Sequence, residues 1–422
     1  MRSKLRYMIF ITVICLTVLT LSAMAVSGGI VRYLAPAATP FSDAVIRLLP
    51  EFEKETGIKV EVILLPFDQI FQKTILAASN KTGEYDLIQL ERPFLPAYVE
   101  PGYLVSLNKY LPTSFIDDMF PVHRDFCTFN GELYAVPHSH DIRCLYYRTD
   151  LLEKAGLKEP PKNPKELLDY AIKLNDPQNG VYGMLVAGSS IPGVWVLSDF
   201  IEWMGGSILD KDGKPVVNSP EAVAGLQLFV DMLLKDKVLA PGTPNYKWND
   251  TRHLFSKGNA AMVAEFNDIV PLLEDPEESV VSGKYGMAHL PGPTNNGGKL
   301  LAIPVGAKNI EDAAKLLQWI VGPRAQMEMC QVSGTLSPMK SIIDKLIAEG
   351  DKSLPVSNPK SSARWDFYKG IVETAYDLPR TSKEPDIEQV LQRALSSALA
   401  GTKTPKEALD SANNEITDLM GE

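Results

Sequence analysis

The chain has 422 residues, a formal net charge of −10 at neutral pH and 45% hydrophobic residues. This length is enough for two folded domains, and the apolar fraction is that of an ordinary folded core. An acidic surface disfavours nucleic acid and anionic membranes, so we expect neither as a partner.

The first 25 residues have the composition of a secretory signal peptide. A start with three basic residues is followed by an apolar run over residues 7–21 and by Ala23-Met24-Ala25, which supplies the small residues of a cleavage site. The alternative is an uncleaved anchor helix, but the apolar run is short for a bilayer span. We predict cleavage after Ala25, a mature chain of charge −13 (−10 minus three positive charges) and a periplasmic location.

Three cysteines remain in the predicted mature chain. An odd number in an oxidising compartment permits one bridge and one free thiol. A bridge between Cys127 and Cys144 is one interpretation, because these residues flank a predicted hairpin. The interpretation that we favour is that both residues and Cys330 are buried and unbridged.

The N-terminal part of the mature chain alternates between strand and helix patterns. This order predicts a parallel sheet with crossover helices. Ligands of such sheets lie beyond the carboxyl ends of the strands, which points to the loops at 37–41 and 89–94. The predicted elements are a strand over 30–34, a helix over 43–56, a strand over 58–63, a helix over 68–78 and a strand over 85–90.

A predicted hairpin then leads into a polar stretch. Asn130-Gly131 supplies the positive φ angles of a tight turn, and residues 133–136 follow as a return strand that Pro137 ends. The polar residues 138–141 connect it to a strand over 144–147. Two short strands joined by a polar stretch predict a hinge between two bodies, with the carboxylate of this stretch facing the cleft.

The second body is predicted to contain more helix than strand. The predicted helices are 151–155, 165–174, 194–204, 220–235 and one that begins at residue 250 or 251, and the predicted strands are 183–186 and 260–263. The later predicted elements are a return strand over 300–304, a helix over 310–321, a crossing at 334–338 and a closing helix pair over 386–420.

Several segments together resemble one protein family. The run over residues 129–157, Phe-x-x-x-Thr-Gly-Ile-Lys-Val at 52–60, Tyr-Asp-Leu-Ile at 85–88 and Gly-Tyr-Leu at 102–104 occur in the family's order. The chain thus resembles the extracellular solute-binding proteins of bacterial ABC importers, of the carbohydrate-binding type typified by maltose-binding protein.

The resemblance implies an α/β fold with two lobes, the type II periplasmic binding protein fold. Each lobe is expected to be a mostly parallel sheet flanked by helices, and each is expected to be discontinuous, with hinge crossings between them. The expected first lobe comprises residues 26–137 and 300–337, and the expected second lobe comprises residues 138–299 and 338–422.

The resemblance also implies roles for residues at the predicted cleft. Sugar recognition needs aromatic faces and planar polar groups. In this family an aromatic side chain at the position of Trp195 stacks on the sugar, and a carboxylate at the position of Asp141 accepts a hydrogen bond from a sugar hydroxyl. The alternative for Trp195 is a core tryptophan, and the alternative for Asp141 is a solvated hinge residue. The other candidate ligand-binding residues are Thr39, Phe41, Glu91, Arg92, Glu265, Asn267, Asp268 and Arg380.

One departure from the family pattern and one alternative interpretation limit these roles. The family pattern often has a tryptophan between Met262 and Asp268, and this sequence has none, which argues against a long stacked oligosaccharide. Arg380 lies in an irregular stretch and has a surface salt bridge as its alternative.

Other chemistry receives little support. His138 and His140 alternate on an extended segment, which permits metal ligation, but no third ligand follows nearby, so we expect no metal. Gly297-Gly298-Lys299 lacks the first glycine and the final Ser or Thr of a phosphate loop, and residues 188–193 lack the spacing of a nucleophile elbow.

The sequence therefore predicts the periplasmic substrate-binding component of an ABC importer, without a cofactor and without catalysis. It is expected to be a monomer that binds a sugar, small oligosaccharide or polyol and delivers it to membrane permease subunits. The alternatives are a secreted glycan-degrading enzyme with two cleft carboxylates, and a binding protein for a polyamine or another non-sugar solute.

Overall fold

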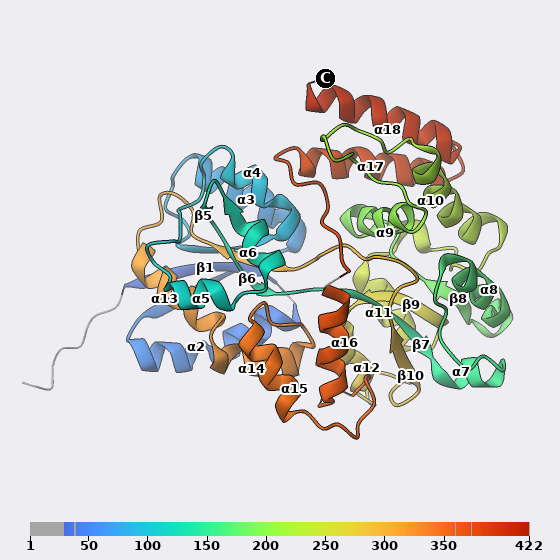
Figure 1. Ribbon diagram of the computed structural model, residues 1–422, viewed down its shortest axis with the longest axis horizontal. Coiled ribbons are helices and arrows are strands. Elements are labelled where there is room, and N and C mark those ends of the chain that lie inside the picture. Colours follow the sequence, from blue (N-terminus) through green and yellow to red (C-terminus); the bar gives the residue numbers. More distant parts are fainter. Residues whose placement is uncertain (1–28, 38, 359, 373, 422) are drawn as a thin grey trace, which may run out of the picture.

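The chain forms two lobes, each built on its own β-sheet, in the computed structural model (Figure 1). The structure describes residues 29–37, 39–358, 360–372 and 374–421, so the predicted signal peptide lies outside the described residues. None of the helices in these ranges is both long enough and apolar enough to cross a membrane. The first lobe, at the left of Figure 1, contains the blue and cyan segments, and the second contains the green and yellow ones.

The sheet of the first lobe has five strands in the order β2-β1-β3-β11-β6. β1 runs parallel to β2 and β3, whereas β11 runs antiparallel to both β3 and β6. The late strand β11 therefore lies between two early ones. The strands are β1 (Ile30–Pro36), β2 (Lys59–Leu65), β3 (Leu87–Glu91), β6 (Val136–Ser139) and β11 (Lys299–Ala302).

Local sequence sets the ends of the helices in this lobe. Thr39 caps α2 by accepting a hydrogen bond from the backbone N–H of Ser42, and Gly57 ends the helix with a φ of 73°. The helices are α2 (Pro40–Thr56), α3 (Phe67–Ser79), η1 (Arg92–Phe94), α4 (Leu95–Val99), α5 (Thr113–Asp118), α6 (Pro121–Cys127), α13 (Ile310–Ile320) and α14 (Pro323–Ser333).

The predicted hairpin turn is confirmed, but the return strand is shorter than predicted. Asn130 and Gly131 have φ angles of 51° and 81° between β4 (Thr128–Phe129) and β5 (Glu132–Leu133). The prediction that Pro137 ends a strand is wrong, because Pro137 lies inside β6. β6 is an edge strand, and an edge strand tolerates a residue without an N–H.

The sheet of the second lobe has four strands in the order β10-β7-β9-β8. Only β8 and β9 pair in parallel, and β7 runs antiparallel to both neighbours. One strand in each sheet runs against all the others, β11 in the first and β7 in the second, so both sheets are mostly parallel in strand direction, as expected. The strands are β7 (Arg143–Arg148), β8 (Tyr182–Leu185), β9 (Ala260–Phe266) and β10 (Tyr285–Ala288).

Helices cover both faces of the second sheet. Phe200 of α9 and Phe229 of α10 stack at 4.9 Å between ring centroids. α17 and α18 pack on these helices. The helices before the return strand are α7 (Thr149–Lys154), α8 (Pro164–Leu174), η2 (Pro177–Asn179), α9 (Ser190–Trp203), α10 (Pro220–Val230), the π-helical η3 (Asp231–Lys235), η4 (Thr243–Asn245), α11 (Trp248–Ser256), η5 (Asn267–Ile269) and α12 (Val270–Glu274). The C-terminal helices are α15 (Lys340–Glu349), α16 (Ser362–Val372), α17 (Glu384–Leu399) and α18 (Pro405–Met420).

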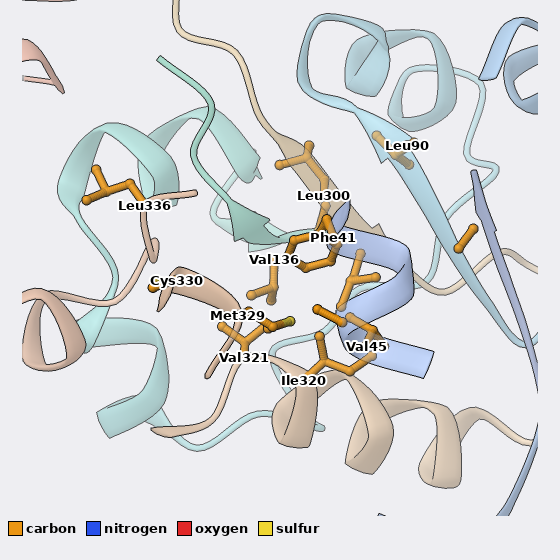
Figure 2. Packing of buried hydrophobic residues seen from close by; sticks show 14 of the residues in the cluster. Phe41, Val45, Leu90, Val136, Leu300, Ile320, Val321, Met329, Cys330 and Leu336 are labelled. Atoms are coloured by element: carbon orange, nitrogen blue, oxygen red, sulfur yellow. The ribbon is translucent and has the colours of Figure 1, made fainter. Parts of the chain in front are cut away.

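The buried apolar residues form two clusters. One fills the first lobe and continues to Tyr146 and Trp365 beneath the second sheet, and the other lies among α9, α10, α17 and α18. Figure 2 shows part of the first cluster, in which Phe41 is grouped with Val136 and Leu300. The two lobes therefore share apolar packing on one side of their junction.

The chain crosses between the sheets at residues 140–142 and 289–298. An isolated antiparallel β-bridge joins His140 of the first crossing to Leu336, which lies in the predicted crossing at 334–338. The predicted lobe boundaries at 137/138 and 299/300 fall inside β6 and β11 and stay predictions. The favoured interpretation of the cysteines is confirmed, because Cys127, Cys144 and Cys330 are buried and free.

Candidate functional site

A short segment of the chain connects the two lobes at their junction. We call residues 376–383 the strap; it runs from α16 towards α17 (Figure 1). Arg380 of the strap donates a hydrogen bond of 2.7 Å to the carbonyl of Thr128, and the N–H of Ser382 donates one of 3.3 Å to Glu100. Because Thr128 and Glu100 belong to the first lobe, the strap fastens the C-terminal helices to that lobe.

Four charged residues meet where the chain crosses between the sheets. Lys299 begins β11 and is paired in register with Glu91, the last residue of β3. Its ammonium group donates a hydrogen bond to Asp141 in the crossing, and the negative charge of Asp268 also acts on it. Although burial alone would lower the pKa of Lys299, these three carboxylates raise it. We call these four residues the hinge cluster.

The carboxyl of Glu91 is perturbed by its place in the hinge cluster. Burial raises its pKa to about 7, with Lys299 opposing the rise and the charges of Asp141 and Asp268 adding to it. Three predicted site residues thus come together around Lys299, although their contact with a ligand stays a prediction.

Arg252 of α11 holds two predicted site residues of the second lobe. Its guanidinium donates hydrogen bonds of 2.5 and 3.1 Å to Asp268 and one of 2.9 Å to Glu265. Asn267 lies between them in the chain and bonds to the crossing instead: its Oδ1 accepts from the N–H of Ile142, and its Nδ2 donates to the carbonyl of His140, both at 3.3 Å. Asn267 therefore fastens the crossing to η5.

Arg92 joins the first lobe to the strap. Its side chain is buried, and Nη2 lies 2.8 Å from Oδ1 of Asp377. Arg92 also donates to the carbonyl of Val122 at 3.1 Å, and Asn296 donates to the same oxygen of Asp377 at 3.1 Å. This predicted site residue thus links η1, the strap and the segment that leads into β11.

A second Arg–Asp pair lies wholly within the second lobe. Arg143 of β7 and Asp199 of α9 are 2.5 Å apart, and both are buried. Asp199 also accepts hydrogen bonds from Tyr376 at 2.9 Å and from the N–H of Asn295 at 3.1 Å. Burial raises the pKa of Asp199 to about 6, which Arg143 and the other donors oppose.

Two predicted aromatic ligands lie in the cores of their lobes. Trp195 is 4% exposed, and its Nε1–H donates a hydrogen bond of 2.6 Å to Glu388 of α17. Phe41 is 2% exposed and lies 4.1 Å from the ring of His138. Their ligand contact stays a prediction, but the burial of Trp195 favours its alternative as a core residue.

The two remaining candidates are structural as they stand. The side chain of Thr39 is occupied in capping α2. The guanidinium of Arg380 lies 4.1 Å above the ring of Phe129 and donates to a backbone carbonyl, which attaches the strap. Ligand contact by Thr39 and Arg380 stays a prediction.

Burial lowers the pKa of two histidines beside the crossing. Together with the charge of Lys299 it holds the pKa of His138 well below its usual value, and together with the charge of Arg92 it lowers the pKa of His140 to about 3. Within the described ranges, no group of three or more His, Cys, Asp or Glu residues is arranged to hold a metal ion.

A small cavity lies between the lobes. Its volume is about 40 Å³, and its walls include Gln89, Glu91 and Phe94 from the first lobe and Ile191 from α9 of the second. Small-molecule sites usually enclose about 300–1,000 Å³. A ligand of sugar size therefore requires the lobes to move apart before it enters.

Buried polar atoms without partners gather on both sides of this junction. They belong to Gln89 in the first lobe, to His138 and Asp141 at the crossing, and to Glu384 and Glu388 on α17. These atoms make no hydrogen bond with any described residue. Such groups are costly in a folded protein, and the hydroxyls of a ligand would satisfy them.

Sequence reasoning missed several of these residues. Lys299 follows two glycines and begins the return strand, but its neighbours follow only from the order of the strands in the sheet. Glu388 carried a weak signal, because it interrupts the apolar face formed by Ile387 and Leu391.

Comparisons with known proteins were made for the whole chain. The family model described as Bacterial extracellular solute-binding protein matches residues 38–327. A probable ABC transporter-binding protein of Deinococcus radiodurans is 27% identical over 387 residues, covering 87% of this chain and 88% of the relative. Maltose-bound MalE3 of T. maritima has a TM-score of 0.84 at 26% identity, covering 93% of this chain and 100% of the other. A ribitol-bound ABC transporter solute-binding protein of Agrobacterium radiobacter K84 has a TM-score of 0.81 at 29% identity, covering 93% and 99%.

Proposed function

Because the chain belongs to the bacterial extracellular solute-binding proteins, we propose that it is the substrate-binding component of an ABC importer for a sugar, small oligosaccharide or polyol. The similar structures with bound maltose and bound ribitol support this ligand class. The ligand would be held between the lobes in the periplasm and then released to membrane permease subunits.

The observation that carries this proposal is the hinge cluster. Glu91 and Lys299 come from the sheet of the first lobe, Asp141 from the crossing and Asp268 from the second lobe. A ligand favours closure only through contacts that differ between the open and closed forms. Groups contributed by both lobes provide such contacts, because they converge only when the lobes are closed.

Asp141 is the residue that we propose as the central hydroxyl acceptor. One of its oxygens accepts from Lys299, whereas the buried Oδ1 has no partner among the described residues. A ligand hydroxyl bound to Oδ1 would thus complete the hydrogen bonding of this carboxylate.

We also propose that the protein does not hydrolyse its ligand. Two carboxylates of the hinge cluster are each engaged by a basic side chain, Asp141 by Lys299 and Asp268 by Arg252. A glycosidase needs one free carboxylate and one carboxylic acid across the scissile bond.

Titration calorimetry of the mature chain with ribitol, D-mannitol and maltose tests this proposal. We expect saturable binding of at least one of these ligands and at least tenfold weaker binding by Asp141→Asn, which loses the charge that fixes Lys299. Asp212→Asn, at an exposed turn, is the matched control and should bind as the wild type does. Absence of binding by these three ligands and by the amine probes described below, or release of glucose from maltose, would contradict the proposal.

A further inference from the structure

Two carboxyl groups of α17 face the junction between the lobes. Glu384 and Glu388 are one helical turn apart, and both are buried. Each has an Oε2 atom without a hydrogen-bond partner among the described residues. The other oxygen of Glu388 accepts the hydrogen bond from Trp195, which fixes the orientation of this carboxyl.

The opposite wall, in the first lobe, also presents acceptors. α17 packs against η1, and the residue before η1 is Glu91, whose charge acts on Glu388. Glu91 lines the inter-lobe cavity together with Gln89, which is buried and has an unpaired Oε1. The unpartnered amide oxygen of Gln89 is independent of the acidic residues and belongs to the same cavity wall as Glu91.

Among the residues that the structure describes, no basic side chain forms a salt bridge with either carboxyl of the α17 pair. Two basic side chains of the first lobe at the junction are already engaged, Arg92 by Asp377 and Lys299 by Asp141. Only carboxylates act on the two groups electrostatically: Glu91 on Glu388, and Glu388 on Glu384. Burial raises the pKa of Glu388 to about 8 and that of Glu384 well above its usual value, and these like charges add to the effect.

We infer that this part of the junction is a subsite for an ammonium group, so that the ligand is an aminated polyol or an amino sugar. The inference rests on the proposed function and specifies its substrate. An ammonium group has three donors and no acceptor, which matches walls that offer acceptor oxygens. Its charge also compensates carboxylates that are otherwise buried without a counter-ion.

Calorimetry with two matched pairs of probes tests the inference on the intact mature chain. The pairs are 1-amino-1-deoxyribitol with ribitol, and D-glucosamine with D-glucose. We expect the amine of at least one pair to bind at least tenfold more tightly than its neutral partner at pH 7.5. Equal or weaker binding of both amines overturns the inference while the proposed function stands. Absence of binding by all four probes, with ribitol, mannitol and maltose also inactive, refutes both.

The pH dependence of ligand affinity gives a second readout, because its sign differs between an ammonium ligand and a neutral one. An ammonium ligand requires ionised carboxylates, so its affinity should fall at least fivefold between pH 7.5 and pH 5.5. A neutral ligand is enclosed with protonated carboxyls, so its affinity should rise over the same interval. The groups that face Glu388 in this reasoning are Glu384 on its own helix and Glu91 on β3, while Arg92 stays paired with Asp377. An amine whose affinity rises on acidification overturns the inference.

Substitutions on α17 separate the subsite from the fold. Glu388→Gln keeps an acceptor for Trp195 and removes the charge; we expect at least tenfold weaker amine binding and less than a threefold change for the neutral partner. Asp386→Asn removes a charge from an exposed position in the first turn of α17 and should change the affinity for neither the amine nor its neutral partner. If thermal unfolding shows that Glu388→Gln does not fold, Glu384→Gln replaces it in the test. Equal losses for the amine and its neutral partner overturn the inference.

Discussion

Two Arg–Asp pairs have similar lengths and different roles. Arg143 and Asp199 are 2.5 Å apart with side-chain exposures of 0% and 3%, and both belong to the second lobe. Arg92 and Asp377 are 2.8 Å apart with exposures of 2% and 35%, and they join the first lobe to the strap. The first pair joins α9 to β7 within the second lobe. The second pair lies at the junction between the lobes, which has to open before a ligand enters.

The difference shows that distance alone does not identify a residue that controls closure. A charge buried within one lobe stays buried when the lobes separate, so its pair contributes to unfolding only. A pair between lobes is broken by opening as well. Because its carboxylate is already partly exposed to water, breaking the pair costs little free energy. Substitutions at the two pairs should therefore separate stability from closure.

The largest effect is expected for Asp199→Ala. The substitution leaves Arg143 buried without its carboxylate, and removal of one partner of a buried pair costs about 3–5 kcal/mol of unfolding free energy. Urea unfolding without ligand measures the loss. Asp212→Ala, at an exposed turn, is the control and should stay within about 0.5 kcal/mol of the wild type. A loss of unfolding free energy below about 1 kcal/mol would show that the pair of Asp199 with Arg143 does not stabilise the fold as proposed.

Glu91→Gln should change how stability depends on pH. The pKa of Glu91 is about 7 in the folded protein, above the usual value of about 4.3. The folded state therefore binds this proton more tightly, and the resulting stabilisation is present in acid and is lost as pH rises through 7. The stability of the variant relative to the wild type should increase by about 2–3 kcal/mol from pH 4.5 to pH 8.

Thermal and urea unfolding at several pH values measure this difference. Glu221→Gln, at an exposed position of α10, is the control. An offset between variant and wild type that does not vary with pH would show that Glu91 titrates normally in the folded protein.

Asp377→Asn should affect closure more than unfolding. Its carboxylate is partly exposed, so we expect about 1 kcal/mol or less of lost stability. Without the charge that holds Arg92, the ligand-free protein should open more often, which small-angle scattering would detect as a larger radius of gyration. Asp117→Asn removes half of an exposed pair of 4.0 Å within the first lobe and should leave the radius unchanged. A stability loss equal to that of Asp199→Ala would erase the distinction between the two pairs.

The smallest effect is expected for Arg380→Ala. This exposed side chain attaches the strap through one carbonyl and one aromatic ring, so the unfolding free energy should change by about 0.5 kcal/mol or less. Urea unfolding checks this value. A loss above about 2 kcal/mol would show that the strap supports the fold itself.

The elements were predicted well where local patterns determine them. Asn130-Gly131 requires positive φ angles, and Gly57 ends a helix, so these sites follow from chemistry within a few residues. The sheet pairing did not follow, because β11 could be placed between β3 and β6 only with knowledge of the tertiary order. The expectation of mostly parallel sheets still holds, because only β11 in the first sheet and β7 in the second run against the other strands.

The candidate site was predicted in part. The strand-end rule and the family resemblance led to Glu91, Asp141 and Asp268, which the structure brings together. Lys299 was missed because its pairing depends on register, and Glu388 was missed because a buried carboxyl on a helix has no sequence signature apart from its apolar neighbours. Sequence also gives no measure of how far the lobes enclose Trp195.

The position of β11 has a consequence for biosynthesis. The first sheet lacks its inner strand until residue 302 has left the ribosome, so neither β6 nor the outer edge of β3 has a permanent partner during most of translation. Pairings between segments so distant in sequence form slowly. A nascent polypeptide of this design therefore completes its first sheet only late in synthesis.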